Sequence, residues 1–166
     1  TGYKFYNGEG HFKGHASVSG NICQKTLERL HYDSGTIKKA VFLVERHDMV
    51  MNDDPVLIKK HLKKFGEKPY FDLLNVHIAD DLAKAPAAMS RIPVYNSAKY
   101  MAKKILAEKE CFSLKELDVN GNDMLNLGYT GADIGKALDF LLNSVIEEKI
   151  SKKRDRLIKY IKENNI

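Results

Sequence analysis

Residues 130–146 read Thr-Gly-Ala-Asp-Ile-Gly-Lys-Ala-Leu-Asp-Phe-Leu-Leu-Asn-Ser-Val-Ile and contain the clearest periodic pattern of the chain. Apolar side chains recur here at steps of three and four residues, which is the spacing of one face of an α-helix. The residues of this face are Ile134, Ala137, Leu138, Leu141, Leu142, Val145 and Ile146. Thr130 and Asp133 form a start that resembles a capping box. The segment therefore predicts a helix that buries one face in a core.

The same periodicity continues through most of the 166 residues, and no convincing run of alternating apolar and polar residues interrupts it. We therefore expect an all-α fold, a helical body followed by a small helical tail. The expected helices cover about residues 15–30, 34–47, 54–65, 69–85, 97–109, a short segment after Ser113, 130–146 and a final segment capped by Ser151. A loop-like stretch from Pro86 to Asn96 predicts a boundary between a first unit, residues 1–95, and a second unit, residues 96–166.

Composition limits the classes of protein to consider. The net charge of +5 and the pI near 9.0 permit contact with nucleic acid, but Lys and Arg are interspersed with Asp and Glu, which equally fits a solvated basic surface. Cys23 and Cys111 form no CxxC pair, so neither a disulfide framework nor a cysteine zinc site is indicated. We expect a cytoplasmic protein with no membrane partner, because no apolar run approaches the roughly 18 residues of a membrane span.

Three side chains with metal-ligand chemistry lie on separate predicted helices: His15, His47 and Asp80. Imidazole and carboxylate groups suit first-row divalent metals, and ligands from different helices can converge in the core of a bundle. Each residue also has a structural interpretation. His47 fits a hydrogen-bonded core histidine, His15 fits a residue that orders the entry to its helix, and Asp80 fits an exposed acid beside Asp81. The sequence predicts a candidate metal site and leaves this alternative open.

A second candidate site precedes the helix of residues 130–146. The segment from Gly128 to Lys136 is a glycine-rich turn that leads into a helix N-terminus, where free backbone amides and the helix dipole favour a phosphate. Gly131 and Gly135 would let an RNA backbone approach closely, and Lys136 adds a positive charge. The glycines have a structural interpretation of equal weight, Gly128 as a helix C-cap and Gly135 as a close helix crossing.

Three segments resemble, in order, successive motifs of the HD domain found in bacterial tRNA nucleotidyltransferases and poly(A) polymerases. They are Phe12–Ser19, Leu43–Asp48 and Leu74–Ala83. In that family an earlier helix ends in a His-Asp pair, and Thr1-Gly2 is similar to the residues that follow the pair. The resemblance implies an incomplete HD-type metal site at His15, His47 and Asp80. It also places the family's nucleotidyltransferase head before residue 1.

The C-terminal part is similar to the tRNA-contacting tail of CCA-adding enzymes, through Leu117–Asp123, Leu127–Gly128 and Thr130–Leu138. The resemblance implies RNA contacts by Asn120, Gly121, Gly128, Gly131, Gly135 and Lys136. Enzymes of this family add nucleotides from CTP and ATP to the 3′ end of tRNA, using magnesium in the head. We therefore expect this chain to hold tRNA without catalysing the transfer itself. Whether the enzyme adds CCA, CC, A or poly(A) is left open by the sequence.

Two other functions fit the same residues. One is an HD-type phosphohydrolase that acts on a nucleotide, a cyclic phosphate or a phosphomonoester. In that enzyme a divalent metal at His15, His47 and Asp80 would polarise the phosphoryl group and generate a hydroxide nucleophile. The other is a helical interaction module without catalytic activity.

Overall fold

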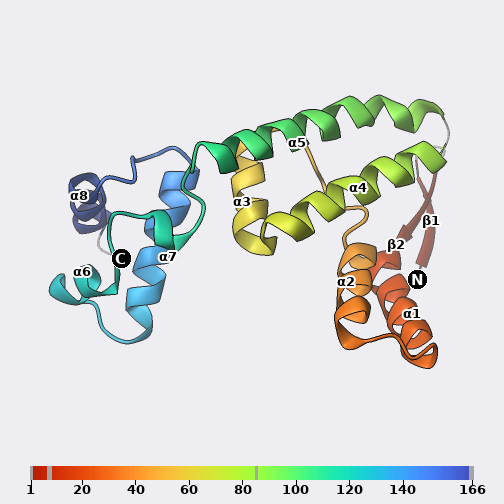
Figure 1. Ribbon diagram of the computed structural model, residues 1–166, viewed down its shortest axis with the longest axis horizontal. Coiled ribbons are helices and arrows are strands. Elements are labelled where there is room, and N and C mark those ends of the chain that lie inside the picture. The colour runs from red at the N-terminus through yellow and green to blue at the C-terminus, as the bar shows by residue number, and fades with distance from the viewer. Residues whose placement is uncertain (1, 7–8, 85, 165–166) are drawn as a thin grey trace. The chain divides into compact units, whose positions relative to one another are not determined.

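The computed structural model describes residues 2–6, 9–84 and 86–164, and these are mostly helical, as the periodicity predicts (Figure 1). The chain divides into two compact units. The first contains residues up to Met51 and Phe71–Tyr95, and the second contains Asn52–Tyr70 and the residues from Asn96 onward. The expected boundary near residue 95 coincides with one of the points where the chain passes from one unit to the other. Asn52–Tyr70, which we expected in the first unit, groups with the second.

The first unit begins with a β-hairpin that the helical periodicity does not predict. Strand β1 (Gly2–Tyr6) pairs antiparallel with β2 (Glu9–Lys13), so that Tyr6 lies opposite Glu9. The sequence between these two residues is Asn7-Gly8, which is the dipeptide most typical of two-residue hairpin connections. A local turn signal, and not an alternating pattern, was therefore the available indication of the hairpin.

Helices α1 (His15–Arg29) and α2 (Ser34–Glu45) lie side by side in the first unit (Figure 1). Gly20 of α1 is buried against α2, and a Cβ atom at this position would lie 2.6 Å from Cγ of Glu45. The absence of a side chain at Gly20 therefore leaves room for the Glu45 side chain against α1. Helix α2 is capped by Asp33, whose carboxylate accepts hydrogen bonds from the Thr36 N–H and hydroxyl at 3.0 and 2.6 Å.

The middle of the chain contains α3 (Pro55–Phe65), α4 (Glu67–Ala83), the 3₁₀ helix η1 (Pro86–Arg91) and α5 (Ile92–Ala107). The predicted start of α3 is confirmed, because the Asp54 carboxylate accepts a hydrogen bond from Val56 N–H at 3.0 Å. The expected loop before Asn96 is wrong, since η1 and the first turn of α5 occupy it. Pro93 fits there because the first turn of a helix leaves backbone N–H groups without helical partners.

The remaining elements are η2 (Leu114–Glu116), α6 (Gly121–Asn126), α7 (Ala132–Ile146) and α8 (Arg154–Asn164). Helix α7 confirms the helix predicted from residues 130–146, although its N-cap is Gly131, which provides no side-chain cap. Its apolar face packs against α8 in a core that includes Ala137, Leu141, Leu142, Ile146, Leu157 and Ile161. None of the helices in the described ranges combines the length and the apolar character that crossing a bilayer requires.

Three lysines of α3 form ion pairs with other residues of the second unit. The pairs are Lys59–Glu110, Lys60–Glu147 and Lys63–Asp139, with N–O distances of 2.6, 2.7 and 2.5 Å. Ile58 and Leu62 of the same helix are completely buried or nearly so. Burial of apolar side chains supplies most of the stabilisation, while exposed ion pairs contribute little each and mainly select the partner surface.

Candidate functional site

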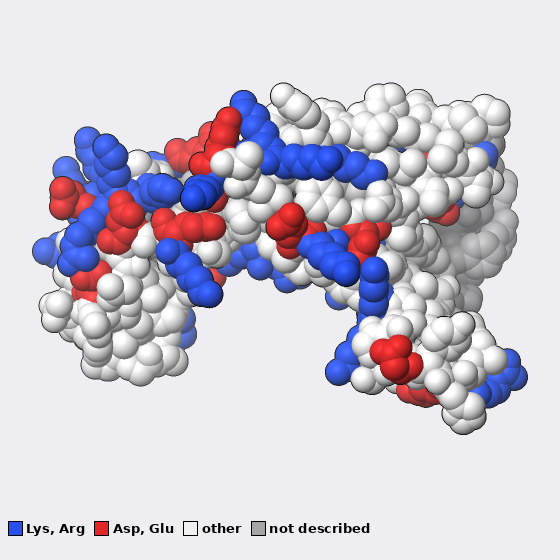
Figure 2. All heavy atoms as spheres, viewed as in Figure 1, with Lys and Arg blue, Asp and Glu red and all other residues white. Residues whose placement is uncertain are grey.

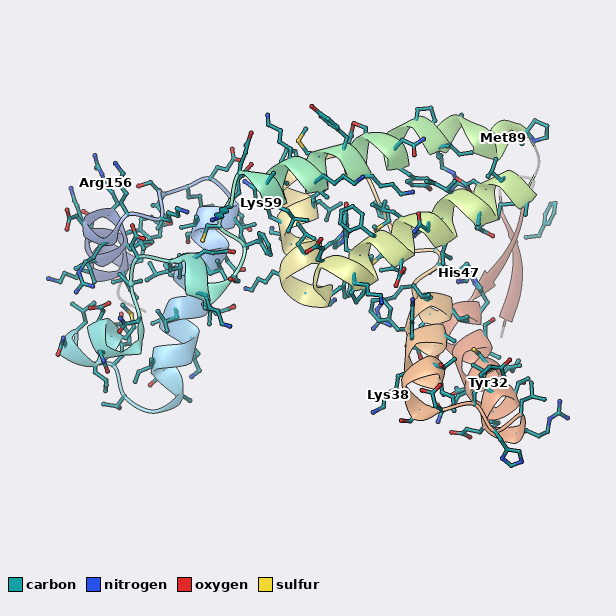
Figure 3. All side chains as sticks on the ribbon, viewed as in Figure 1. Tyr32, Lys38, His47, Lys59, Met89 and Arg156 are labelled. Carbon is teal, nitrogen blue, oxygen red and sulfur yellow. The ribbon has the colours of Figure 1, made fainter. Side chains whose placement is uncertain are left out.

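The three predicted metal ligands line one cavity of about 370 Å³ in the first unit. His15 is the first residue of α1, because Gly14 adopts a left-handed conformation with φ of 78° and turns the chain into the helix. His47 lies just beyond the C-terminal end of α2 and not within a helix (Figure 3). Asp80 lies in the last turn of α4. Residues far apart in sequence therefore meet at one site.

His15 and His47 are in direct contact. Their Nε2 atoms lie 3.2 Å apart, and their rings meet edge to face with centroids 5.0 Å apart. Nδ1 of His47 lies 2.7 Å from the Val44 carbonyl, which can only accept, so Nδ1 donates and the Nε2 of the neutral ring keeps its lone pair. Two nitrogen ligands of one divalent metal stand roughly 3–3.5 Å apart when each lies about 2.1 Å from it. At 3.2 Å, Nε2–H of His15 can donate to the lone pair of His47, and the same separation also fits two nitrogen ligands of one metal.

Asp80 lines the same cavity but does not join the histidine pair. Its carboxylate forms an ion pair with Lys84, one helical turn later on α4. Among the side chains that the structure describes, moreover, no three of His, Cys, Asp or Glu are grouped so that they could hold a metal ion. The structure thus brings together two of the three predicted ligands, and Asp80 would have to leave Lys84 to become the third.

Sequence reasoning missed a buried polar cluster beside these residues. Asp81 is 2% exposed and forms an ion pair with Arg91, and Lys84 Nζ lies 4.0 Å from the same carboxylate. His77 is 6% exposed, and its ring lies 5.3 Å from that of Tyr95. Burial lowers the pKa of His77, although Asp81 acts in the opposite direction. The four-residue spacing of His77 and Asp81 on one helix face was the available signal for this cluster.

The predicted RNA turn lines a second cavity, of about 670 Å³, in the second unit. Its lining residues are Leu127, Gly128, Tyr129, Thr130, Asp133, Lys136, Ile161 and Lys162. Gly128 has a φ of 95°, a left-handed value that glycine adopts without strain, and a Cβ atom there would meet no other atom within 4 Å. The backbone at this turn is therefore open to a ligand. Lys136 contributes a cation, but its ammonium lies 2.8 Å from the Asp133 carboxylate.

The other predicted RNA contacts lie outside this cavity. The Asn120 side chain caps α6 by accepting a hydrogen bond from Asn122 N–H at 2.9 Å, and Asp123 accepts from Asn120 N–H at 2.8 Å. Gly121 begins the same helix. Gly131 and Gly135 are exposed at the start of α7, and a Cβ atom at either would meet nothing within 4 Å. Of the six residues, only Gly128 and Lys136 line the cavity.

Comparison of the chain with protein-family models, with curated proteins and with solved structures finds no match.

Proposed function

We propose that this chain is the body and tail of an enzyme of the tRNA nucleotidyltransferase and poly(A) polymerase family, and that it holds tRNA while CCA or A is added to the 3′ end from CTP and ATP. The cavity lined by Gly128, Tyr129 and Lys136 carries this proposal, because it combines an open backbone, an aromatic ring and a cation at the predicted turn. Bases stack on aromatic rings, and phosphates bind cations. The magnesium of the transfer reaction is not assigned to any residue of this chain.

The order of the HD-like motifs gives independent support. In the proposed relationship, His15, His47 and Asp80 come from three successive motifs, and the structure has them around one cavity. Cys23 and Cys111 are both free thiols, which fits the reducing cytoplasm in which tRNA is processed.

Binding of a labelled tRNA transcript to the chain, measured by fluorescence anisotropy across a salt series, tests the proposal. We expect affinity to fall steeply with salt, because bound phosphates release counterions. Lys136→Glu should weaken binding and reduce the salt slope by about one, whereas Lys103→Glu, an exposed lysine of α5, should leave both unchanged. A wild-type chain that does not bind tRNA would contradict the proposal and leave a protein-interaction module as the better interpretation.

A second candidate is an HD-type phosphohydrolase, which the 3.2 Å contact between the His15 and His47 Nε2 atoms favours. A divalent metal held there would polarise a phosphoryl group and lower the pKa of a bound water. His15 and His47 would hold it through Nε2, while Lys84 and Arg91, which line the same cavity, would attract the substrate phosphate. Metal content after equilibration with Mn²⁺ or Zn²⁺, together with hydrolysis of bis(p-nitrophenyl) phosphate, tests this candidate. Loss of both on His47→Ala, with tRNA binding unaffected, would favour it.

A further inference from the structure

We infer that a track of cations around α8 binds the sugar–phosphate backbone of RNA, next to the cavity at Gly128. We define the α8 track as Lys149, Arg156, Lys159 and Lys162. The inference rests on the proposed function, which it deepens by naming the part of the RNA that is bound and the surface that binds it.

The track is continuous because neighbouring hollows share its lysines. Lys162 lines both the cavity at Gly128 and a second hollow of about 510 Å³. Lys159 lines that second hollow and also a third, of about 450 Å³, which Lys149 and Arg156 line as well. A chain of hollows thus leads from the predicted RNA turn around α8, within the second unit.

Helix α8, which carries most of the track, is held in place by apolar contacts with α7. Leu157 and Ile161 are completely buried against α7, and the Tyr160 ring stacks on Phe140 with centroids 5.7 Å apart and an angle of 16°. Figure 3 shows Arg156 on α8, with its side chain directed outward from the helix. The cations are therefore held on a rigid helix, which reduces the entropy lost when a ligand orders them.

The steps of three residues from Arg156 to Lys159 and Lys162 determine the shape of the track. Each step of three residues falls about 60° short of a full turn and rises about 4.5 Å along the helix axis. From Arg156 to Lys162 the cations therefore wind around α8 over roughly 9 Å of its length. A stacked nucleic-acid strand advances about 3.4 Å per nucleotide, so this length matches two or three nucleotides.

The cations of the track differ in whether a carboxylate of the chain already neutralises them. Lys149 and Lys159 are paired with Glu147 at 2.7 Å and Glu163 at 3.7 Å. The side chains of Arg156 and Lys162 form no ion pair within the described ranges of the chain. Figure 2 shows the same mixture of Lys and Arg with Asp and Glu on the C-terminal unit. Arg156 and Lys162 are therefore the positions where an external phosphate would complete the pairing.

The lining of these hollows favours backbone contacts over base recognition. Their cations are long, exposed side chains, which suit the exposed phosphates of an RNA backbone. We therefore expect binding that depends strongly on salt and weakly on RNA sequence.

The test compares the full chain with Arg156→Glu/Lys162→Glu in tRNA anisotropy titrations at several salt concentrations. A matched control is Lys103→Glu/Lys115→Glu, which makes the same charge change at two exposed lysines of the second unit that line none of the three hollows. Circular dichroism verifies that each variant is folded, and Arg156→Gln/Lys162→Gln provides a milder substitution of the same pair.

We expect the α8 variant to lose roughly tenfold or more in affinity and to reduce the salt slope by about two, since about one unit of slope corresponds to each phosphate contact. The glutamine variant should show a smaller loss with the same change in slope. If the α8 variants bind like the control, the track is wrong while the proposed function stands. If the wild-type chain does not bind tRNA, both are wrong.

Discussion

The ammonium of Lys59 lies 2.6 Å from Oε2 of Glu110, and Lys59 is only 5% exposed (Figure 3). A second carboxylate, that of Glu148, lies 3.3 Å away. Glu148 has a φ of 59° and Lys109, next to Glu110, a φ of 51°, so left-handed residues that are not glycine occur beside both carboxylates. These carboxylates follow the C-terminal ends of α5 and α7, and Lys59 connects them to α3.

Glu110→Gln should destabilise the chain more than Glu148→Gln. Removing Glu110 leaves a buried ammonium with only the longer contact, which we expect to cost about 1–3 kcal/mol of unfolding free energy. Glu148 is 67% exposed in its side chain, so its loss should be small. Urea unfolding of the two variants measures the difference, and equal losses would contradict a dominant role for Glu110.

The same cluster predicts a response to alkaline pH. Burial alone would lower the pKa of Lys59, but Glu110 and Glu148 outweigh it and raise the pKa above its usual value of 10.5. The stability from this group is therefore complete below pH 10.5 and is lost as the pH rises through the folded-state pKa. In Glu110→Gln the folded-state pKa should fall, so the alkaline loss should become smaller, because it is confined to the interval between 10.5 and the folded-state pKa. Unfolding midpoints of both proteins between about pH 9 and 12 measure the difference, and equal losses above pH 10.5 would contradict it.

Glu147 should make the chain sensitive to acid. Hydrogen bonds and charge from Lys149 and Lys60 lower the pKa of its carboxyl to about 2. The stability from this group is present above the unfolded value of 4.5 and is lost as the pH falls from there toward 2. In Glu147→Gln the midpoint of thermal unfolding should fall less between pH 5 and pH 2.5 than it does in the wild type. Parallel profiles for the two proteins would exclude the effect.

Gly20 and Glu45 should be coupled. Gly20→Ala places a methyl group 2.6 Å from the present position of Glu45 Cγ, so the Glu45 side chain must move, and we expect a net loss of stability. In a Glu45→Ala background the same change should instead stabilise by about 0.5–1 kcal/mol, because alanine favours a helix over glycine. A double-mutant cycle from urea unfolding measures the coupling, and additive effects would contradict the close approach of α1 and α2.

Arg91→Ala should destabilise the first unit more than Lys84→Ala. Asp81 is 2% exposed, and without Arg91 its buried carboxylate would keep the hydrogen bond with Tyr95 and one cation, Lys84, at 4.0 Å. We expect a cost of about 2–4 kcal/mol. Lys84 and Asp80 are both more exposed, so their pair contributes little. Arg91→Ala combined with Asp81→Asn should recover part of the loss, and no recovery would indicate another role for Arg91.

The helices themselves were predictable because their signals are local. Asp54 and Pro55 begin α3, and the apolar face of residues 130–146 forms α7, through contacts within a few residues of each other. Helix boundaries were less predictable. Helix α5 begins at Ile92 and α8 at Arg154, since neighbouring turns decide where a helix starts. The pairing of β1 with β2 was missed because its signal in the sequence lay in one dipeptide.

The sequence indicated which residue types could form the candidate sites. Which of these residues lie next to one another was decided by the tertiary structure. It brought His15 to His47, thirty-two positions away, and left Asp80 with Lys84. His77 and Asp81 were visible as a pair on one helix, but their burial was not, because burial depends on Tyr95 and Arg91 from another segment.

By itself the sequence determined that this chain is helical, which of its faces are apolar and where its caps and turns can form, because those properties depend on spacings of a few residues. Only the tertiary structure decided that Asn52–Tyr70 joins the C-terminal unit. The contacts of the segment in this unit include those of Lys60 and Lys63 with Glu147 and Asp139, which lie 87 and 76 positions away. Pairings at such separations follow from the packing of whole helices, which no local pattern encodes.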